Sequence, residues 1–196
     1  MVAEVVDNEE LAQEIMDAAG MDIARSSAAQ DAYQMMLEQY RDACAVDHDD
    51  WMNNSPSYGE QYAAISANSD TMLYYHLAGG ATKLFYAYND IDGNGVEELF
   101  IGMGSDVNQA YVADMYVFDG NSASRVNLIT FEILADGTVI ETDPAAAVVS
   151  VRRLAADGYT LENTSAAGLE VGSAITDWSF ADFGGKMLFN WNDLSQ

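Results

Sequence analysis

Apolar and polar residues alternate in two different ways along the chain, and the change falls near Thr82. Before this point apolar residues recur every three or four positions, the spacing of a helix with one buried face. After it they recur every second position between Asp-Gly pairs, a pattern typical of short β-strands joined by tight turns. The sequence therefore predicts an α+β fold, with N-terminal helices packed on a mainly antiparallel β-meander sheet.

Four helices are predicted in the first part of the chain. The first covers residues 7–19, and Gly20 is expected to end it. A stronger helix covers residues 28–45, where Tyr, Met and Ala recur at helical spacing and are expected to face the core. Shorter helices are predicted at residues 58–67 and 70–77, the second stopped by a Gly-Gly pair.

One main domain is expected, because 196 residues suit a single domain with a short extension. Residues 1–26 are assigned to an N-terminal extension with a short helix, and residues 27–196 to one α+β domain. Within that domain, helices are expected over residues 27–80 and the sheet over residues 82–191. The predicted strands cover residues 82–88, 98–103, 111–118, 128–134, 138–142, 148–154, 159–162 and 186–191.

The sharpest motif lies between the first two predicted strands. Asp90, Asp92 and Asn94 occupy alternate positions, and Gly95 follows at the sixth place, where the chain must turn sharply. Calcium prefers six to eight oxygen ligands, and this spacing supplies five of them in the order that calcium loops use. The predicted ligands are four side chains and one backbone carbonyl: Asp90, Asp92, Asn94 and Glu98, with the carbonyl of Val96.

The loop differs from an EF-hand at its twelfth position. An EF-hand has a bidentate Glu there, and this chain has Ile101. Residues 99–103 are typical of a buried strand, so we expect no second helix after the loop. A tight turn without an ion is the alternative interpretation, because Asp-Gly and Asn-Gly are also common turn pairs.

The loop and its flanking strands resemble those of known extracellular proteins. The D-x-D-x-N-G-x-x-E spacing from Asp90 to Glu98 is similar to that of integrin-type repeats and other strand–loop–strand calcium sites. Residues 84–102, an aromatic strand, the D-x-D-G-N-G loop and a Glu-Leu-hydrophobic strand, resemble uncharacterised secreted and lipoprotein domains of Gram-positive bacteria. The resemblance implies an extracellular or cell-surface anchored location and no known reaction.

The charge of the chain narrows its possible partners. Seven basic and 32 acidic residues give a formal net charge of −25. Nucleic-acid binding needs a basic surface, so no nucleic-acid partner is expected. The sequence contains no apolar run long enough for a transmembrane segment and no visible signal segment, so we expect any export signal to be absent from this chain. The acidity fits either a high-salt environment or an ordinary secreted protein.

Three functions remain open from the sequence. The favoured one is a non-catalytic domain with a structural calcium ion, and no catalytic residue is assigned. The second is an extracellular hydrolase that uses acidic residues, although no known nucleophile or zinc motif supports it. The third is a module that binds a glycan or cell-surface protein through Trp51, Trp178 or Trp191. Cys44 is expected to be a buried structural thiol.

Overall fold

The computed structural model describes most of the chain outside two long segments. The described residues are 8–46, 49–50, 82–126, 128, 130–143, 148–165 and 185–194. Side chains of the first helix are described from residue 24 onward. The helices predicted at 58–67 and 70–77, together with Trp51 and Trp178, lie outside the described residues.

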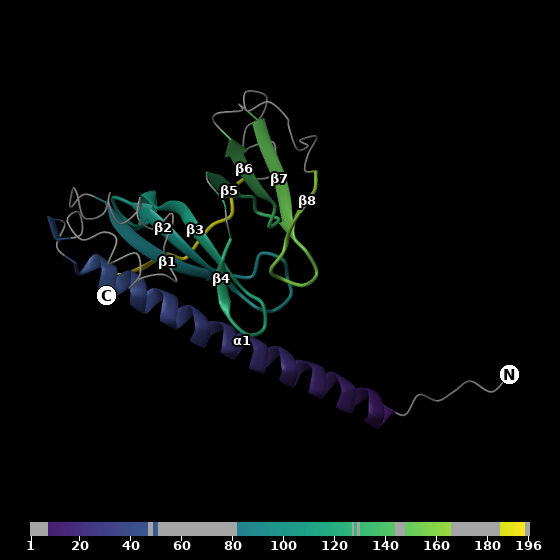
Figure 1. Ribbon diagram of the computed structural model, residues 1–196. Helices are drawn as coiled ribbons and strands as arrows, with labels where there is room; N and C mark the ends of the chain where they lie inside the picture. The colour runs from purple at the N-terminus through teal and green to yellow at the C-terminus, as the bar shows by residue number, and fades with distance from the viewer. Residues whose placement is uncertain are drawn as a thin grey trace.

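One long helix and two antiparallel sheets form the described part of the protein (Figure 1). The elements are α1 (Asn8–Cys44), β1 (Lys83–Asn89), β2 (Glu98–Gly104), the 3₁₀ helix η1 (Val107–Gln109), β3 (Tyr111–Phe118), β4 (Ala123–Arg125), β5 (Phe131–Ile133), β6 (Val139–Asp143), β7 (Val148–Leu154), β8 (Leu161–Asn163) and β9 (Asn192–Asp193). The first sheet has the strand order β4-β3-β2-β1-β9, and the second has the order β5-β6-β7-β8. The described part of the fold is therefore mainly β with one α-helix, compatible with the predicted α+β class, but the single predicted sheet was wrong.

Helix α1 continues through Gly20, where the sequence analysis placed a helix end, so two predicted helices are one. A glycine inside a helix costs only about 1 kcal/mol relative to alanine. Ending the helix there would leave several carbonyl groups without their partners. The C-terminal half packs on the first sheet through a buried face that includes Tyr33, Leu37 and Tyr40, as predicted. The N-terminal half extends beyond both sheets (Figure 1).

Most strands lie where the sequence placed them, and the differences concentrate around the junction of the two sheets. β3 and β7 have the predicted bounds, whereas the strand predicted at 128–134 shortens to β5 and β4 was not predicted. The final strand predicted at 186–191 was also wrong. That segment makes one bridge, Leu134 with Lys186, and ladder pairing with β1 begins only at β9. It crosses from the second sheet to the first, so neither sheet pairs with its whole length.

Strand β2 is apolar on both faces because it lies between two hydrophobic clusters. Leu99 and Ile101 belong to the cluster between α1 and the first sheet. Phe100 points to the opposite face, as alternate strand residues must, and belongs to the cluster between the two sheets. All three side chains are 0% exposed. The sheet that carries the predicted calcium loop is thus covered on one face by the helix and on the other by the second sheet.

A buried polar network connects α1 to β3 and β4. Asp114 is 1% exposed, and the Nε of Arg125 donates to both of its carboxylate oxygens, at 2.6 and 2.7 Å. The Tyr40 hydroxyl donates to the same carboxylate at 3.2 Å and lies 2.9 Å from the Tyr116 hydroxyl. Burial raises the pKa of Asp114, and the charge of Arg125 opposes that rise. The network therefore depends on the pairing of Asp114 with Arg125.

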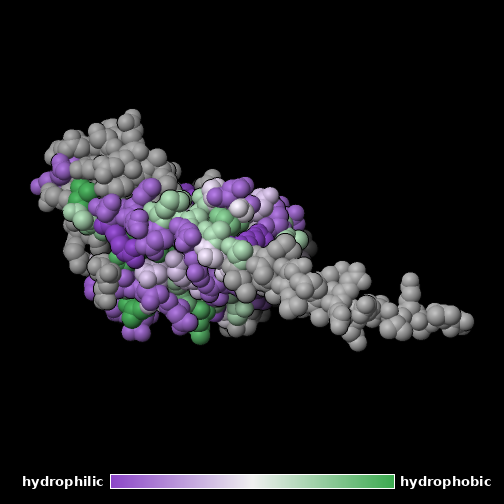
Figure 2. All heavy atoms as spheres, turned by 90° about the horizontal axis from the view of Figure 1, so that it is seen from below, coloured by the Kyte–Doolittle hydropathy of each residue, from purple (hydrophilic) through white to green (hydrophobic). Residues whose placement is uncertain are grey.

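The described residues on one face of the molecule are mostly polar or charged (Figure 2). On the face shown in Figure 2, the coloured residues are mostly hydrophilic and the hydrophobic ones form small separate patches. Cys44 is a free cysteine that is half-buried rather than fully buried as expected, and its partial burial raises the pKa of the thiol to about 12. Within the described residues, no helix combines the length and the apolar character needed to cross a bilayer.

Removing the Asp114 carboxylate is expected to destabilise the protein strongly. The Asp114→Ala variant would leave the Arg125 guanidinium buried without its ion-pair partner, at a cost of about 3–5 kcal/mol. Urea denaturation measures this cost directly. Glu162→Ala, at an exposed position of β8, is the control and should change the free energy of unfolding by about 0.5 kcal/mol or less. A loss below about 1 kcal/mol in Asp114→Ala would contradict the role given to the network.

Candidate metal centre

The loop between β1 and β2 brings three carboxylates together. In the antiparallel pairing of these strands, Asn89 lies opposite Glu98. Asp90 follows Asn89 directly, so the strand register brings Asp90 and Glu98 to the same end of the pair. Oxygen atoms of Asp90, Asp92 and Glu98 all lie within 4.8 Å of one another. The predicted acidic residues therefore converge on one point, although Asp90 and Glu98 are eight positions apart in sequence.

Backbone N–H groups hold Asp90 at the centre of the turn. Its Oδ1 accepts from the N–H groups of Gly93 at 2.8 Å and Asn94 at 3.1 Å, and its Oδ2 accepts from Gly95 at 2.9 Å. The two glycines have φ values of 76° and 85°, in the left-handed region that glycine adopts without a side-chain clash. The Gly residues thus let three successive N–H groups turn toward one carboxylate.

The remaining predicted ligands lie in the same loop. The Nδ2 of Asn94 donates to Asp92 Oδ2 at 2.8 Å, and its Oδ1 accepts from the Val96 N–H at 2.7 Å. An amide oxygen has two lone pairs, so this bond leaves Asn94 Oδ1 able to bind an ion. The side chain of Val96 is 3% exposed and packs in the cluster between α1 and the first sheet, which fixes the end of the loop.

Glu98 places a carboxyl group in the protein interior. It is 1% exposed, and its Oε2 accepts a hydrogen bond of 3.0 Å from the Ile91 N–H. Its pKa is raised to about 8, first by burial and then by the charges of Asp92 and Asp90. The pKa of Asp92 is raised as well, mainly by burial and also by Asp90. A carboxylate in this setting must be neutralised, either by a proton or by a cation.

The turn between β5 and β6 packs directly against the loop. A Cβ atom added to Gly137 would lie 1.9 Å from the backbone oxygen of Ile91, so only glycine fits there. Its φ of 81° also favours glycine. The sequence predicted a turn at Asp136-Gly137 but gave no indication that it meets the loop.

A second turn and the helix complete the surroundings. A Cβ atom added to Gly158, between β7 and β8, would lie 2.4 Å from Asn94 Nδ2 and 3.5 Å from Asp92 Oδ2. The Nη2 of Arg25, in α1, donates to the backbone oxygen of Asp157 at 3.1 Å. The sequence did not indicate that Arg25 or Gly158 lies near the loop, because contacts between residues more than sixty positions apart leave no local pattern. The loop thus lies where the helix and both sheets meet.

The arrangement suits a hard cation. All of the converging groups are oxygen donors, which favour calcium or magnesium over metals that prefer nitrogen or sulfur. Three carboxylates would carry three negative charges when ionised, enough to attract a divalent ion. Burial and the repulsion from Asp92 and Asp90 together raise the pKa of Glu98, and neutralising the carboxylates would remove that repulsion. The chemistry that the geometry supports is therefore ion binding.

Substitution of Gly137 tests the contact between the second sheet and the loop. Gly137→Ala must either displace the Ile91 carbonyl or open the turn, so it should cost more than the 1–2 kcal/mol or so of a left-handed alanine. Gly120→Ala is the matched control, because Gly120 also has a positive φ but has nothing within 4 Å of an added Cβ. Urea denaturation compares the two variants. Equal losses would show that the Gly137 contact contributes nothing.

Without divalent ions, the protein should become less stable as the pH rises. The pKa of Glu98 in the folded state, about 8, lies above its ordinary value of 4.5. Between these values the folded state keeps a proton that the unfolded chain has released, so stability falls with rising pH. Thermal unfolding in EDTA should give a midpoint several degrees lower at pH 7.5 than at pH 5.5. Glu98→Gln, which cannot ionise, should show a smaller slope, and an unchanged slope would exclude Glu98 as the source.

No model of a known protein family matches this chain, and no curated protein or solved structure matches it either. The interpretation of the loop therefore rests on its own residues and geometry. The resemblance to secreted domains of Gram-positive bacteria, drawn from residues 84–102, stays a prediction.

Proposed function

We propose that this chain is a calcium-binding extracytoplasmic domain of a secreted or cell-surface protein, in which the ion stabilises the fold. One observation carries the proposal: buried Glu98 lies with Asp90 and Asp92 within 4.8 Å, so three carboxylates share one small space. Such a group is costly to bury unless a cation neutralises it. An ion bound there would connect the start of β2 to the preceding loop.

Calcium fits this loop better than magnesium does. Calcium accepts six to eight oxygen ligands in flexible geometry, whereas magnesium requires a tight octahedron and keeps several water molecules. The loop offers carboxylates, the Asn94 amide and a backbone carbonyl at the spacing that calcium sites use. Extracellular calcium would fill even a weak site, with a Kd on the order of 10⁻⁴ to 10⁻³ M, which supports the proposed location.

The surroundings of the loop support a structural role over a catalytic one. The turns at Gly137 and Gly158 pack against the loop, and Arg25 binds the second of these turns. An ion in this position would fix the loop against which both of these turns pack. Binding of the ion and stability of the fold are then coupled, because the unfolded chain does not bring the ligands together.

Calcium titration tests the proposal. The thermal midpoint should rise by several degrees when millimolar calcium replaces EDTA, and by less with magnesium. Calorimetric titration should show binding to the parent protein. The Asp90→Ala/Asp92→Ala double variant should lose both effects. The control is Asp106→Ala/Asp119→Ala, which removes the same charge from two exposed turns and should keep the calcium response.

Two outcomes would contradict the proposal. If calcium neither binds nor shifts the midpoint of the parent protein, the loop is a turn without an ion. If the Asp90→Ala/Asp92→Ala variant responds as the control does, calcium binds elsewhere on the acidic surface.

A further inference from the structure

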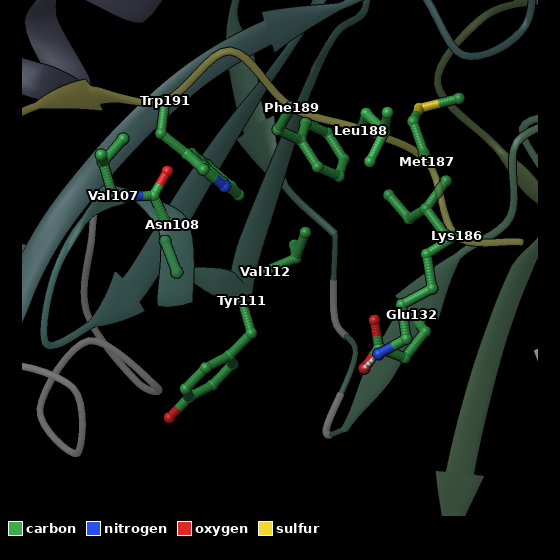
Figure 3. Close-up of a pocket in the computed structure, with 12 residues that line it drawn as sticks. Val107, Asn108, Tyr111, Val112, Glu132, Lys186, Met187, Leu188, Phe189 and Trp191 are labelled. Atoms are coloured by element: carbon green, nitrogen blue, oxygen red, sulfur yellow. Dashed lines mark hydrogen bonds and ion pairs between the residues drawn. The ribbon is translucent and has the colours of Figure 1, made fainter.

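A second feature, separate from the acidic loop, is a pocket between the two sheets (Figure 3). Its volume is about 340 Å³, near the lower end of the range for ligand pockets. Tyr111 and Val112 at the start of β3 line one wall. The opposite wall comes from the segment before β9, through Lys186, Met187, Leu188, Phe189 and Trp191. Figure 3 shows Glu132 of β5 facing Lys186 at one end, where the two side chains form an ion pair.

The rim of this pocket gathers exposed apolar side chains. Five large hydrophobic residues in the described part of the chain are exposed, and three of them line the pocket. These are Val107, Tyr111 and Leu188, which are 43%, 52% and 90% exposed. Single exposed apolar residues are common, but a group around one concavity is typical of an interaction site. A leucine that is 90% exposed gains stability only when something covers it.

The aromatic wall of the pocket is held in place by the first sheet. The rings of Phe189 and Trp191 stack with centroids 4.9 Å apart, and Phe100 lies 4.8 Å from Phe189. A Cβ atom added to Gly102 of β2 would lie 2.9 Å from the Trp191 ring, so the ring rests on the strand backbone. The wall is therefore ordered before any partner arrives, which lowers the entropy cost of binding.

The chemistry of the rim decides between classes of partner. A sugar ring needs several hydrogen-bonding groups around it. Of the polar lining residues, Glu132 and Lys186 pair with each other, which leaves Asn108 and Tyr111. The aliphatic side chains of Val107 and Leu188 on the rim offer no hydrogen-bonding group. A protein side chain buried against aliphatic and aromatic walls fits better, and the volume is sufficient for one large apolar residue. The net charge of −25 attracts a basic partner and repels an acidic one.

We propose that the inter-sheet pocket binds a basic peptide segment of a partner protein by taking up one large apolar side chain. The exposed rim covers the flanking residues of that segment, and the acidic surface attracts its positive charges. This inference does not rest on calcium binding, because the pocket residues are distinct from those of the loop.

A pair of synthetic peptides tests the apolar anchor. One peptide has a central phenylalanine between lysines, and the other has alanine in its place. Binding is measured by fluorescence anisotropy of labelled peptide, at moderate salt and with millimolar calcium present throughout. The phenylalanine peptide should bind about tenfold or more tightly than the alanine peptide, because burial of a Phe side chain contributes that much. Equal affinities would mean that charge alone attracts the peptides and would overturn the proposal.

Two variants test the position of the site. Leu188→Asp should weaken binding of the phenylalanine peptide about tenfold. Met35→Asp makes the same charge change at an exposed apolar residue of α1, which is 59% exposed, and should leave the affinity within about twofold. Both positions are exposed, so both variants should fold, as circular dichroism can verify. Equal effects of the two substitutions would place the peptide elsewhere.

Other occupants would give different results. If a trisaccharide of N-acetylglucosamine binds, Leu188→Asp abolishes that binding and neither peptide binds, the pocket is a glycan site. If sedimentation shows a dimer that Leu188→Asp dissociates, a second copy of the chain covers the pocket. Either outcome would overturn the proposal of a basic peptide partner.

Discussion

The burial of Glu98 is the constraint on which the rest of the arrangement depends. Its backbone belongs to β2, whose following residues fill the two hydrophobic clusters on either face of the first sheet. The side chain therefore cannot move to solvent without disturbing that strand. Burial raises the pKa of its carboxyl group, and the charges of Asp92 and Asp90 raise it further. The protein must supply either a proton or a cation at this point, and the oxygen donors of the loop favour a cation.

Strand β2 also connects the two candidate sites. Its first residue is Glu98, in the acidic loop, and Gly102 near its other end supports the Trp191 ring in the wall of the inter-sheet pocket. Both sites lie where the first sheet meets elements of the second, and the segment 186–191 crosses from one sheet to the other.

The sequence predicted much of the acidic loop because its information is local. The alternation of Asp90, Asp92 and Asn94 and the left-handed glycines act within a few residues, through N–H groups that turn toward one carboxylate. Glu98 could also be foreseen, since a strand returning after a tight loop brings it back beside Asp90. Arg25 and the turns at Gly137 and Gly158 could not, because they reach the loop only through packing of the helix and the second sheet.

The sequence by itself determined the change from helix to strands, the bounds of β3 and β7, the buried face of α1 and the acidic loop, because each depends on spacing along the chain. Only the tertiary structure decided that α1 passes through Gly20, that the strands divide into two sheets, and that a pocket forms between them. The physical reason is the same for all three. Local preferences of about 1 kcal/mol give way to the burial of large apolar surfaces, and that burial is settled among residues far apart in sequence.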